Sequence, residues 1–337
     1  MATTDDFLKV FSKGVKKSAK KKVFPLRLKP NAPLREKTTG GDIGIELEIE
    51  GRNLPRGPAV RGGPKMAPKS GALWTVHDDG SLRGESAEYV LSTPVFKEEV
   101  KPCLDHIWGK LSNDVTEVIP SNRTSTHVHI NAQGLRLNQF VSWIVLWTMY
   151  EEAMVSVCGE ERKSNHFCLT NLETDGWLVE SVFSHLSKGK TSWSRDTKYS
   201  SLNLGAFTTF GSLEFRSMGT MQSVEQVLDW AFALYGLREK ASSRPFNDPS
   251  RIPALVSEMG AANLFREICL ENGVSEAFVE KVFGSYNNDE AAFNAVCLEG
   301  LRDAQRLCYL IDWTEWLPDI EKAYVKDPFA SKKALRG

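Results

Sequence analysis

The stretch SLEFRS (Ser212–Ser217) places a carboxylate and a guanidinium two residues apart, between apolar neighbours. Successive side chains of a β-strand point to opposite faces, so Glu214 and Arg216 would share one face and the apolar residues the other. A carboxylate can hold a cation, and an arginine can bind phosphate or neutralise the carboxylate beside it. Taken alone, the pair fits an ordinary surface ion pair and half of a reaction centre equally well.

The same spacing recurs in other segments that have the pattern of strands. GIELEIEG carries Glu46, Glu48 and Glu50 on one face, and STHVHIN carries His127 and His129 on one face. Each segment also has an apolar face suited to a hydrophobic core. Two further segments, SAEYVLS and YSSLNLGAF, arrange polar residues in the same way, at Glu88, Ser201 and Asn203.

Each pattern alone also has a structural explanation. The wet face of a half-exposed antiparallel sheet needs polar residues, and a pair of histidines is often a hydrogen-bonded part of the structure. Solvent-facing strands usually carry Thr, Lys, Ser or Arg, however, rather than alternating Glu in one strand and alternating His in another. Three chemically biased pairs in one chain therefore favour a functional face.

Carboxylates with one histidine suit hard divalent cations such as Mg²⁺ or Mn²⁺. Zinc would prefer more His or Cys ligands, and the cysteines of this chain lack ligand spacing. Magnesium at an open carboxylate site most often serves nucleotide phosphates, and a neighbouring arginine can stabilise a transferring phosphoryl group. The chain has no GxxxxGK[ST] motif and no GxGxxG after a strand, which argues against P-loop and Rossmann sites.

The elements that would position these residues follow from the periodicity of apolar residues. Alternation predicts strands at residues 43–51, 73–82, 87–95, 126–132, 199–207 and 211–218, with turns at Asp79-Gly80 and Phe210-Gly211. Helical spacing predicts helices at 97–111, 138–157 and 224–241, and several more from Ser242 onward. The predicted class is α+β: a mainly antiparallel sheet backed by helices, with a helical C-terminal region at 242–337.

Composition is that of an ordinary globular protein, with 337 residues, 41% hydrophobic and 25% charged. The formal net charge of −1 gives no overall attraction to nucleic acid or membrane. The six cysteines are scattered and no secretory leader precedes the chain, which indicates free thiols and a cytoplasmic protein. The longest apolar stretch, Phe140–Tyr150, is too short to span a bilayer, so we expect a core helix and no membrane partner.

Two segments have a local excess of basic residues. Residues 1–36 form a predicted flexible arm, whose first thirty residues carry nine Lys and Arg against two Asp. A solvated tail and a contact with nucleic acid or an acidic partner through residues 9–29 both remain open. Residues 51–72, rich in Pro and Gly, are a predicted long loop, either a lid over the site or an ordinary surface loop.

Seven short motifs carry a resemblance to a known family, in the order GIELEIE, W…DDGSL, AEYVLSTP, THVHI, ER..N..C, Y..LNL and SLEFR. The ordered set resembles the phage and bacterial amidoligases. These are carboxylate–amine ligases of glutamine-synthetase-like fold, related to glutamine synthetase and glutamate–cysteine ligase. The resemblance covers Gly41–Ala241 and implies a catalytic domain at residues 37–241.

The resemblance implies roles for individual residues. It implies a set of metal ligands made up of Glu46, Glu48, Glu88, His129 and Glu214. It implies catalytic roles for Arg216, Glu214 and His127, and nucleotide contacts from Arg216, His129, Lys198 and Asn203. Residues expected near the substrates are Arg162, Asn165, Tyr199 and Asp78, the last as the group that orients an amine.

The chain departs from the family pattern at two places. Many members have Cys-Gly-Leu before the His-x-His motif, whereas Ser125 and Thr126 precede it here. The family's Arg-Tyr appears as Lys198-Tyr199, which keeps the charge and loses the bidentate fork. Neither departure removes a metal ligand, so they affect the predicted amine or carboxylate pocket more than the ATP chemistry.

The resemblance implies an ATP- and Mg²⁺-dependent ligase, with Mn²⁺ as a possible substitute, acting in the cytoplasm or, if phage-encoded, in the host cytoplasm. ATP would convert a carboxylate to an acyl phosphate, which an amine would attack to form an amide. The substrates would be small molecules, peptides or protein side chains. Three alternatives remain open: a phosphotransferase on the same fold, a non-catalytic protein that binds nucleic acid or a virion partner through the basic arm, and a metal hydrolase.

Overall fold

The computed structural model describes residues 34–35, 37, 40–57, 73–186, 188–193 and 195–310. Nearly all of the predicted basic arm and most of the loop at 51–72 lie outside these residues, as does the end of the predicted C-terminal region. The predictions for the arm and the loop therefore stay predictions.

An antiparallel sheet forms one side of the molecule, with the strand order β2-β3-β1-β5-β7-β6. The strands are β1 (Ile43–Arg52), β2 (Trp74–His77), β3 (Ser86–Leu91), β4 (Glu117–Ile119), β5 (Ser125–Asn131), β6 (Leu202–Asn203) and β7 (Ser212–Met218). β1 is central, because it pairs with β3 along one edge and with β5 and then β4 along the other. The predicted α+β class with a mainly antiparallel sheet is confirmed.

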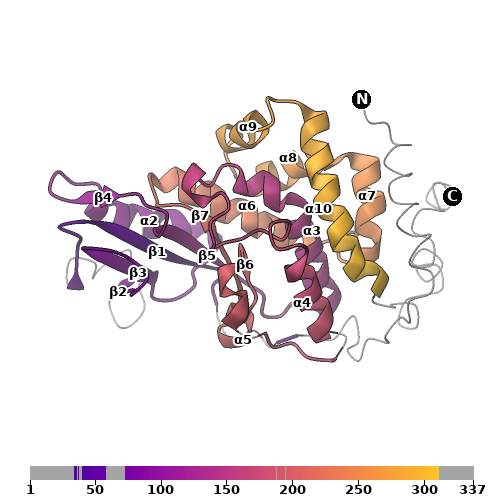
Figure 1. Cartoon of the computed structure of the whole chain (residues 1–337), viewed down its shortest axis with the longest axis horizontal. Coiled ribbons are helices and arrows are strands. Elements are labelled where there is room, and N and C mark those ends of the chain that lie inside the picture. Colours follow the sequence, from indigo (N-terminus) through magenta and orange to yellow (C-terminus); the bar gives the residue numbers. More distant parts are fainter. Residues whose placement is uncertain are drawn as a thin grey trace.

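The other regular elements of the described chain are helices, and Figure 1 shows most of them at the end of the molecule opposite β1–β4. They are α2 (Lys97–Leu111), α3 (Leu137–Val155), α4 (Trp177–Leu186), α5 (Gly205–Thr209), α6 (Val224–Ser242), α7 (Ile252–Met259), α8 (Ala261–Glu271), α9 (Glu276–Gly284) and α10 (Glu290–Leu310). The three helices predicted before residue 242 are confirmed, and so is the helical character of the C-terminal region up to residue 310.

The strand predicted at 199–207 is wrong over most of its length. Only Leu202–Asn203 pair with β7, and α5 begins at Gly205. The side-chain oxygens of Thr197 and Asn203 both accept the N–H of Gly205, at 2.9 Å each. Such side-chain hydrogen bonds to the following backbone favour a turn over an extended chain. Asn203, which was predicted to lie on the polar face of a longer strand, therefore helps to end the strand.

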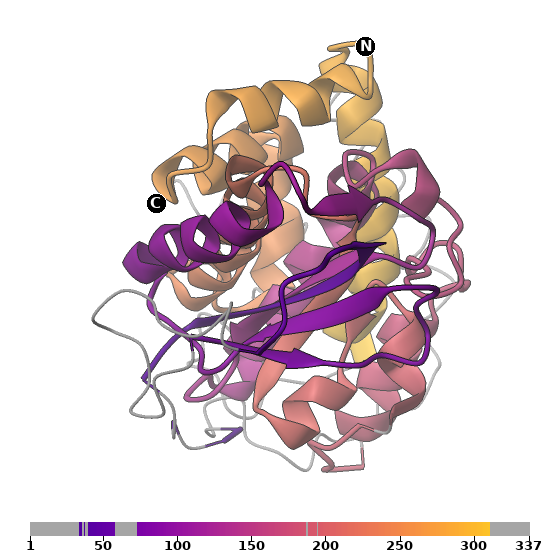
Figure 2. The same cartoon turned by 90° about the vertical axis from the view of Figure 1, so that its left-hand side faces the viewer.

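The apolar face of the sheet packs against α3, which is buried on almost every side. The rings of Trp143 and Trp147 lie 5.8 and 4.7 Å from that of Phe215 in β7. On its other side α3 contacts α10, where a Cβ on Gly300 would lie 2.2 Å from the carbonyl oxygen of Thr148. Sheet and C-terminal helices thus share one hydrophobic core, and Figure 2 shows the sheet strands with the helices stacked behind and above them.

The apolar stretch at 140–150 lies within α3 and is a core helix, as predicted. Among the described helices, none combines the length and the hydropathy that crossing a bilayer would require.

A buried acid ties α3 to the chain that leads into β6. Glu151 accepts a hydrogen bond from the N–H of Asn171 at 2.8 Å and another from the hydroxyl of Ser201. Burial raises the pKa of Glu151 to about 8, although both hydrogen bonds act to lower it. The side chain therefore keeps its proton at neutral pH, where an exposed glutamate is ionised.

We expect the variant Glu151→Gln to remove a pH dependence of stability. The pKa of Glu151 is higher in the folded than in the unfolded state. Its contribution to the free energy of unfolding is therefore fully present below about pH 4.5 and is lost as the pH rises to about 8. The variant should match the unaltered protein near pH 5 and be more stable at pH 8, as measured by urea unfolding. Glu280→Gln, at an exposed position of α9, is the control. A stability difference that is the same at both pH values would contradict this account.

Candidate metal and substrate site

Strand register gathers the polar residues of the sheet onto one face. The partners across neighbouring strands are Glu48 with Glu88, Glu46 with His127, His129 with Glu214, and Glu214 with Asn203. The opposite face of the same strands carries the buried apolar residues described above. The alternation recognised in the sequence therefore becomes a single polar surface that spans five strands.

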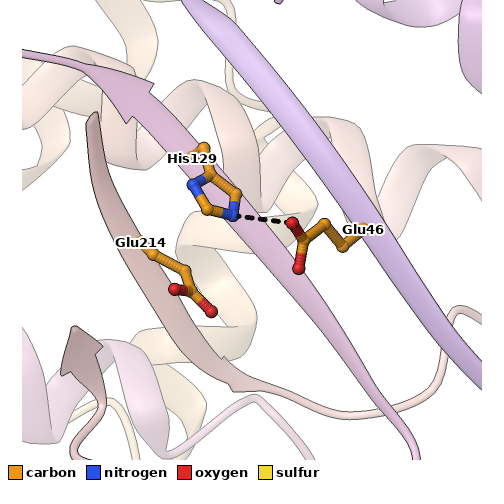
Figure 3. A group of neighbouring side chains, drawn as sticks. All are labelled: Glu46, His129 and Glu214. Carbon is orange, nitrogen blue, oxygen red and sulfur yellow. Dashed lines mark ion pairs between the residues drawn. The ribbon is translucent and has the colours of Figure 1, made fainter. Parts of the chain in front are cut away.

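A first group of possible cation ligands consists of Glu46, His129 and Glu214. One ligand atom from each lies within 4.8 Å of the others, and Figure 3 shows the three side chains converging from neighbouring strands. His129 Nε2 lies 3.2 Å from Glu46 Oε1, while its Nδ1 lies 3.1 Å from the hydroxyl of Ser212. The contact with Ser212 orients the imidazole so that Nε2 faces the carboxylates.

The charges of this first group depend on one another. Burial raises the pKa of Glu46, but His129 and His127 outweigh it and hold that pKa well below its usual value. Burial lowers the pKa of His129, but Glu46 and Glu214 outweigh it and raise that pKa. In the absence of a cation, a protonated His129 therefore neutralises part of the negative charge.

A second group consists of Glu48, Asp79 and Glu88, whose ligand atoms also lie within 4.8 Å of one another. Burial, followed by the charges of Glu46 and Glu48, raises the pKa of Glu88 to about 7. Asp79 accepts the N–H of Ser81 at 2.6 Å in the turn after β2. Asp79 was expected only to form this turn, and the motif DDGSL was the only signal that could have identified it as a ligand.

The prediction that Asp78 orients a substrate amine does not fit this geometry. Its side chain is 94% exposed and forms an ion pair with Arg56, with 2.9 Å between Oδ1 and Nη1. The turn directs the side chain of the next residue, Asp79, into the site instead.

His127 lies between the two groups and is almost fully buried. Its Nδ1 lies 3.4 Å from both Glu46 and Glu214, and its Nε2 lies 3.5 Å from Glu48. The hydroxyl of Ser125 contacts His127 Nε2 at 2.8 Å and donates to Glu48. The Ser125 that departs from the family pattern is therefore part of the site.

Arg216 forms an ion pair with its neighbour Glu214. Burial lowers the pKa of Arg216, but the carboxylate of Glu214 outweighs this and raises it. Asn203 donates to the second oxygen of Glu214 at 2.6 Å. Arg216 and Asn203 together fix the Glu214 carboxylate, and their predicted contacts with a nucleotide stay predictions.

Arg162 supports the strand that carries Arg216. The register of β5 and β7 shifts by one residue near Arg216 and Ser217, which is a β-bulge. The buried guanidinium of Arg162 donates to the carbonyls of Arg216 at 2.7 Å, Ser217 at 3.2 Å and Thr124 at 3.3 Å. These bonds satisfy backbone acceptors around the bulge, where the regular ladder is interrupted.

A polar cleft of about 290 Å³ lies over the second group and His127. Its lining also includes cationic and aromatic residues: Arg123, Arg162, Phe167, Lys198, Tyr199 and Arg216. Lys198, Tyr199 and Arg162 are thus beside the carboxylates, as expected for residues near substrate or nucleotide. Phe167 lies within the motif ER..N..C but was not itself predicted, and Arg123 comes from a loop for which the sequence offered no signal.

Asn165 does not line this cleft. Its amide donates to the carbonyls of Asn122 at 2.7 Å and Glu161 at 3.0 Å, and its oxygen accepts the N–H of Phe167. It therefore holds together the loops that present Arg123 and Phe167, and its predicted contact with substrate stays a prediction.

No protein-family model matches the chain, and no curated protein matches it either. The chemical class of the site therefore depends on the geometry of its own residues.

The donor atoms fit a hard divalent cation. Each group offers three ligand atoms, five carboxylates and one imidazole in all, and Mg²⁺ and Mn²⁺ prefer such oxygen-rich sets. Ser212, Ser125 and Asn203 hold ligand side chains in place, as outer-shell partners do at metal sites. Glu46, His129 and Glu214 would hold one cation, and Glu48, Asp79 and Glu88 a second.

We expect cation binding to weaken as the pH falls. A proton on Glu88, whose pKa is about 7, competes with the cation for the carboxylate. Between pH 8 and pH 6 this competition alone should reduce the affinity for Mn²⁺ about tenfold. Electron paramagnetic resonance of free Mn²⁺ measures this affinity at each pH. Glu88→Gln should bind more weakly and with less pH dependence, and equal affinity of the unaltered protein at both pH values would contradict the assignment.

We expect Arg162→Met to destabilise the protein strongly, because three carbonyl groups around the bulge would lose a charged donor. The loss should be on the order of 3 kcal/mol or more in the free energy of unfolding. Arg302→Met, at an exposed position of α10, is the matched control and should change stability by about 0.5 kcal/mol or less. Similar effects of the two substitutions in denaturant unfolding would show that Arg162 does not support the bulge.

Proposed function

We propose that the protein is an ATP- and Mg²⁺-dependent carboxylate–amine ligase whose sheet belongs to the glutamine-synthetase-like fold. One observation carries the proposal: two carboxylate-rich ligand groups lie side by side on one face of an antiparallel sheet, joined by His127. The polar cleft is lined by carboxylates together with cationic side chains, which suits a reaction between phosphate, carboxylate and amine groups. The ordered motifs that resemble amidoligases all contribute residues to this face or to its support.

The proposed reaction has two steps. An oxygen of the substrate carboxylate attacks the γ-phosphorus of ATP, and the bond to the bridging oxygen breaks as ADP leaves. The amine nitrogen then attacks the acyl carbon, the bond to the phosphate oxygen breaks, and the proton lost by the amine leaves with the phosphate. Bound Mg²⁺ supplies neutralisation of phosphate charge throughout.

The residues of the chain would bind and orient the reactants. Arg216 is half-buried and lines the polar cleft, where its guanidinium can stabilise the charge of the transferring phosphoryl group. Lys198 and Arg123 line the polar cleft and can attract the substrate carboxylate. His127 keeps the two ligand groups in a fixed relation, so that phosphate and acceptor would meet at one place.

The alternatives predict different products. A phosphotransferase on the same fold would produce ADP and a stable phosphorylated product, with no release of phosphate. A metal hydrolase would turn over without ATP, and a non-catalytic binding protein would consume none.

An assay of ADP and phosphate release tests the proposal across a panel of amino acids and peptides that supply both groups. We expect release of both products only when a carboxylate and an amine are present together. Glu214→Gln should reduce this turnover at least a hundredfold, because a neutral amide replaces a metal-binding carboxylate that also orients Arg216.

Glu50→Gln is the matched control, because Glu50 lies on the same strand and face as Glu46 and belongs to neither ligand group. Its carboxylate accepts the N–H of Arg83 at 2.7 Å, a bond that glutamine can keep. The control should retain turnover. Failure of the unaltered protein to bind Mg²⁺–ATP would refute the ligase, and ADP without phosphate would identify a phosphotransferase.

A further inference from the structure

A second cleft, of about 240 Å³, lies on the other side of Glu46 from the polar cleft. Glu46 and His129 form one of its walls, so it opens directly beside the first ligand group. Its remaining lining is largely apolar and includes Ile45, Val90, Leu91, Pro94 and Phe210. The polar cleft and this apolar cleft thus flank the ligand groups, and their linings differ in chemistry.

Phe210 is presented at this cleft by a rigid turn. The residue is 60% exposed, and its ring meets His129 edge-on, with 6.0 Å between ring centroids. Its carbonyl accepts the amide of Gln133 at 2.8 Å, and its N–H donates to Ala206 at 2.7 Å. The next residue, Gly211, has φ of +79°, and a Cβ there would lie 2.6 Å from the side chain of Gln133. The backbone therefore fixes an aromatic ring that the hydrophobic effect alone would bury.

The cleft also offers polar groups at its edge. The hydroxyl of Ser92 is buried and has no hydrogen-bond partner among the described residues, and the Asp42 carboxylate lies on the same lining. An apolar slot with a fixed aromatic ring and a few polar groups suits a planar heteroaromatic ring, which stacks on one face and makes hydrogen bonds at its edge.

We propose that this apolar cleft receives the base of the nucleoside triphosphate, with Phe210 as its stacking surface. The inference rests on the proposed function and extends it, because it sets the direction of the nucleotide across the sheet. The base lies against Phe210, the phosphates lie over Glu46, His129 and Glu214, and the acceptor substrates occupy the polar cleft. A hydrophobic part of an acceptor substrate is the alternative occupant.

Calorimetric titration of ATP and of inorganic tripolyphosphate, both with Mg²⁺, separates the base from the phosphates. We expect Phe210→Ala to weaken ATP binding roughly 5- to 150-fold, the range for loss of one base stack, and to leave tripolyphosphate binding unchanged. Phe210→Tyr keeps the aromatic ring and should bind both ligands as the unaltered protein does. Thermal unfolding of each variant verifies that the fold is retained.

Equal affinity of Phe210→Ala and the unaltered protein for ATP would overturn the assignment of the base while leaving the ligase proposal intact. An equal loss for ATP and tripolyphosphate would also overturn it, because the substitution would then act on the phosphates. If the unaltered protein bound tripolyphosphate and ATP with the same affinity, the base would make no contact and the apolar cleft would belong to another substrate. Absence of any ATP binding to the unaltered protein would remove the proposed function and this inference with it.

Discussion

Repulsion among buried and half-buried carboxylates is the constraint on which the rest of the site depends. Four acidic side chains on one face of the sheet and Asp79 from the turn after β2 lie close together, and like charges at such short range cannot all ionise without compensation. The protein compensates in two ways: Arg216 supplies positive charge beside Glu214 and the carboxylates raise the pKa of His129, while Glu88 holds its proton up to about pH 7. The arrangement costs folding energy. A structure that keeps so much unfavourable charge together is consistent with a functional role for the cluster.

The remainder of the molecule counteracts this cost by making the strands rigid. α3 fills the core behind β7, and Glu151 joins that helix to the chain entering β6. Arg162 satisfies the carbonyls near the bulge, immediately beside Arg216. Neither Glu151 nor Arg162 needs to touch a ligand to affect the site, because each holds the backbone from which ligand-binding side chains project.

Local periodicity made much of the sheet predictable from the sequence. Side chains alternate with a period of two in any strand, so the faces of β1, β5 and β7 follow from residue types alone. The gathering of Glu46, His129 and Glu214 was also predictable, because antiparallel neighbours in one sheet bring their polar faces together.

The features that escaped prediction depend on backbone geometry that no single segment encodes. Whether Asp78 or Asp79 enters the site depends on the conformation of one turn. The partners of Arg162 exist only because β7 contains a bulge, which leaves no mark in the pattern SLEFRSM. Likewise, the hydrogen bonds that end β6 early require Thr197 and Asn203 to meet across a turn.

The ligand groups are assembled from strands far apart in the chain, since β1 pairs with β3 and β5, and β5 pairs with β7. Neither ligand group lies within one short stretch of the chain. During synthesis, the first group (Glu46, His129 and Glu214) is therefore incomplete until β7 has been made and has paired with β5. Forming such non-local contacts is the slow part of folding. A cation that binds only the completed sheet would therefore stabilise the native state. Without the cation, the strands that carry the repelling carboxylates would separate more easily.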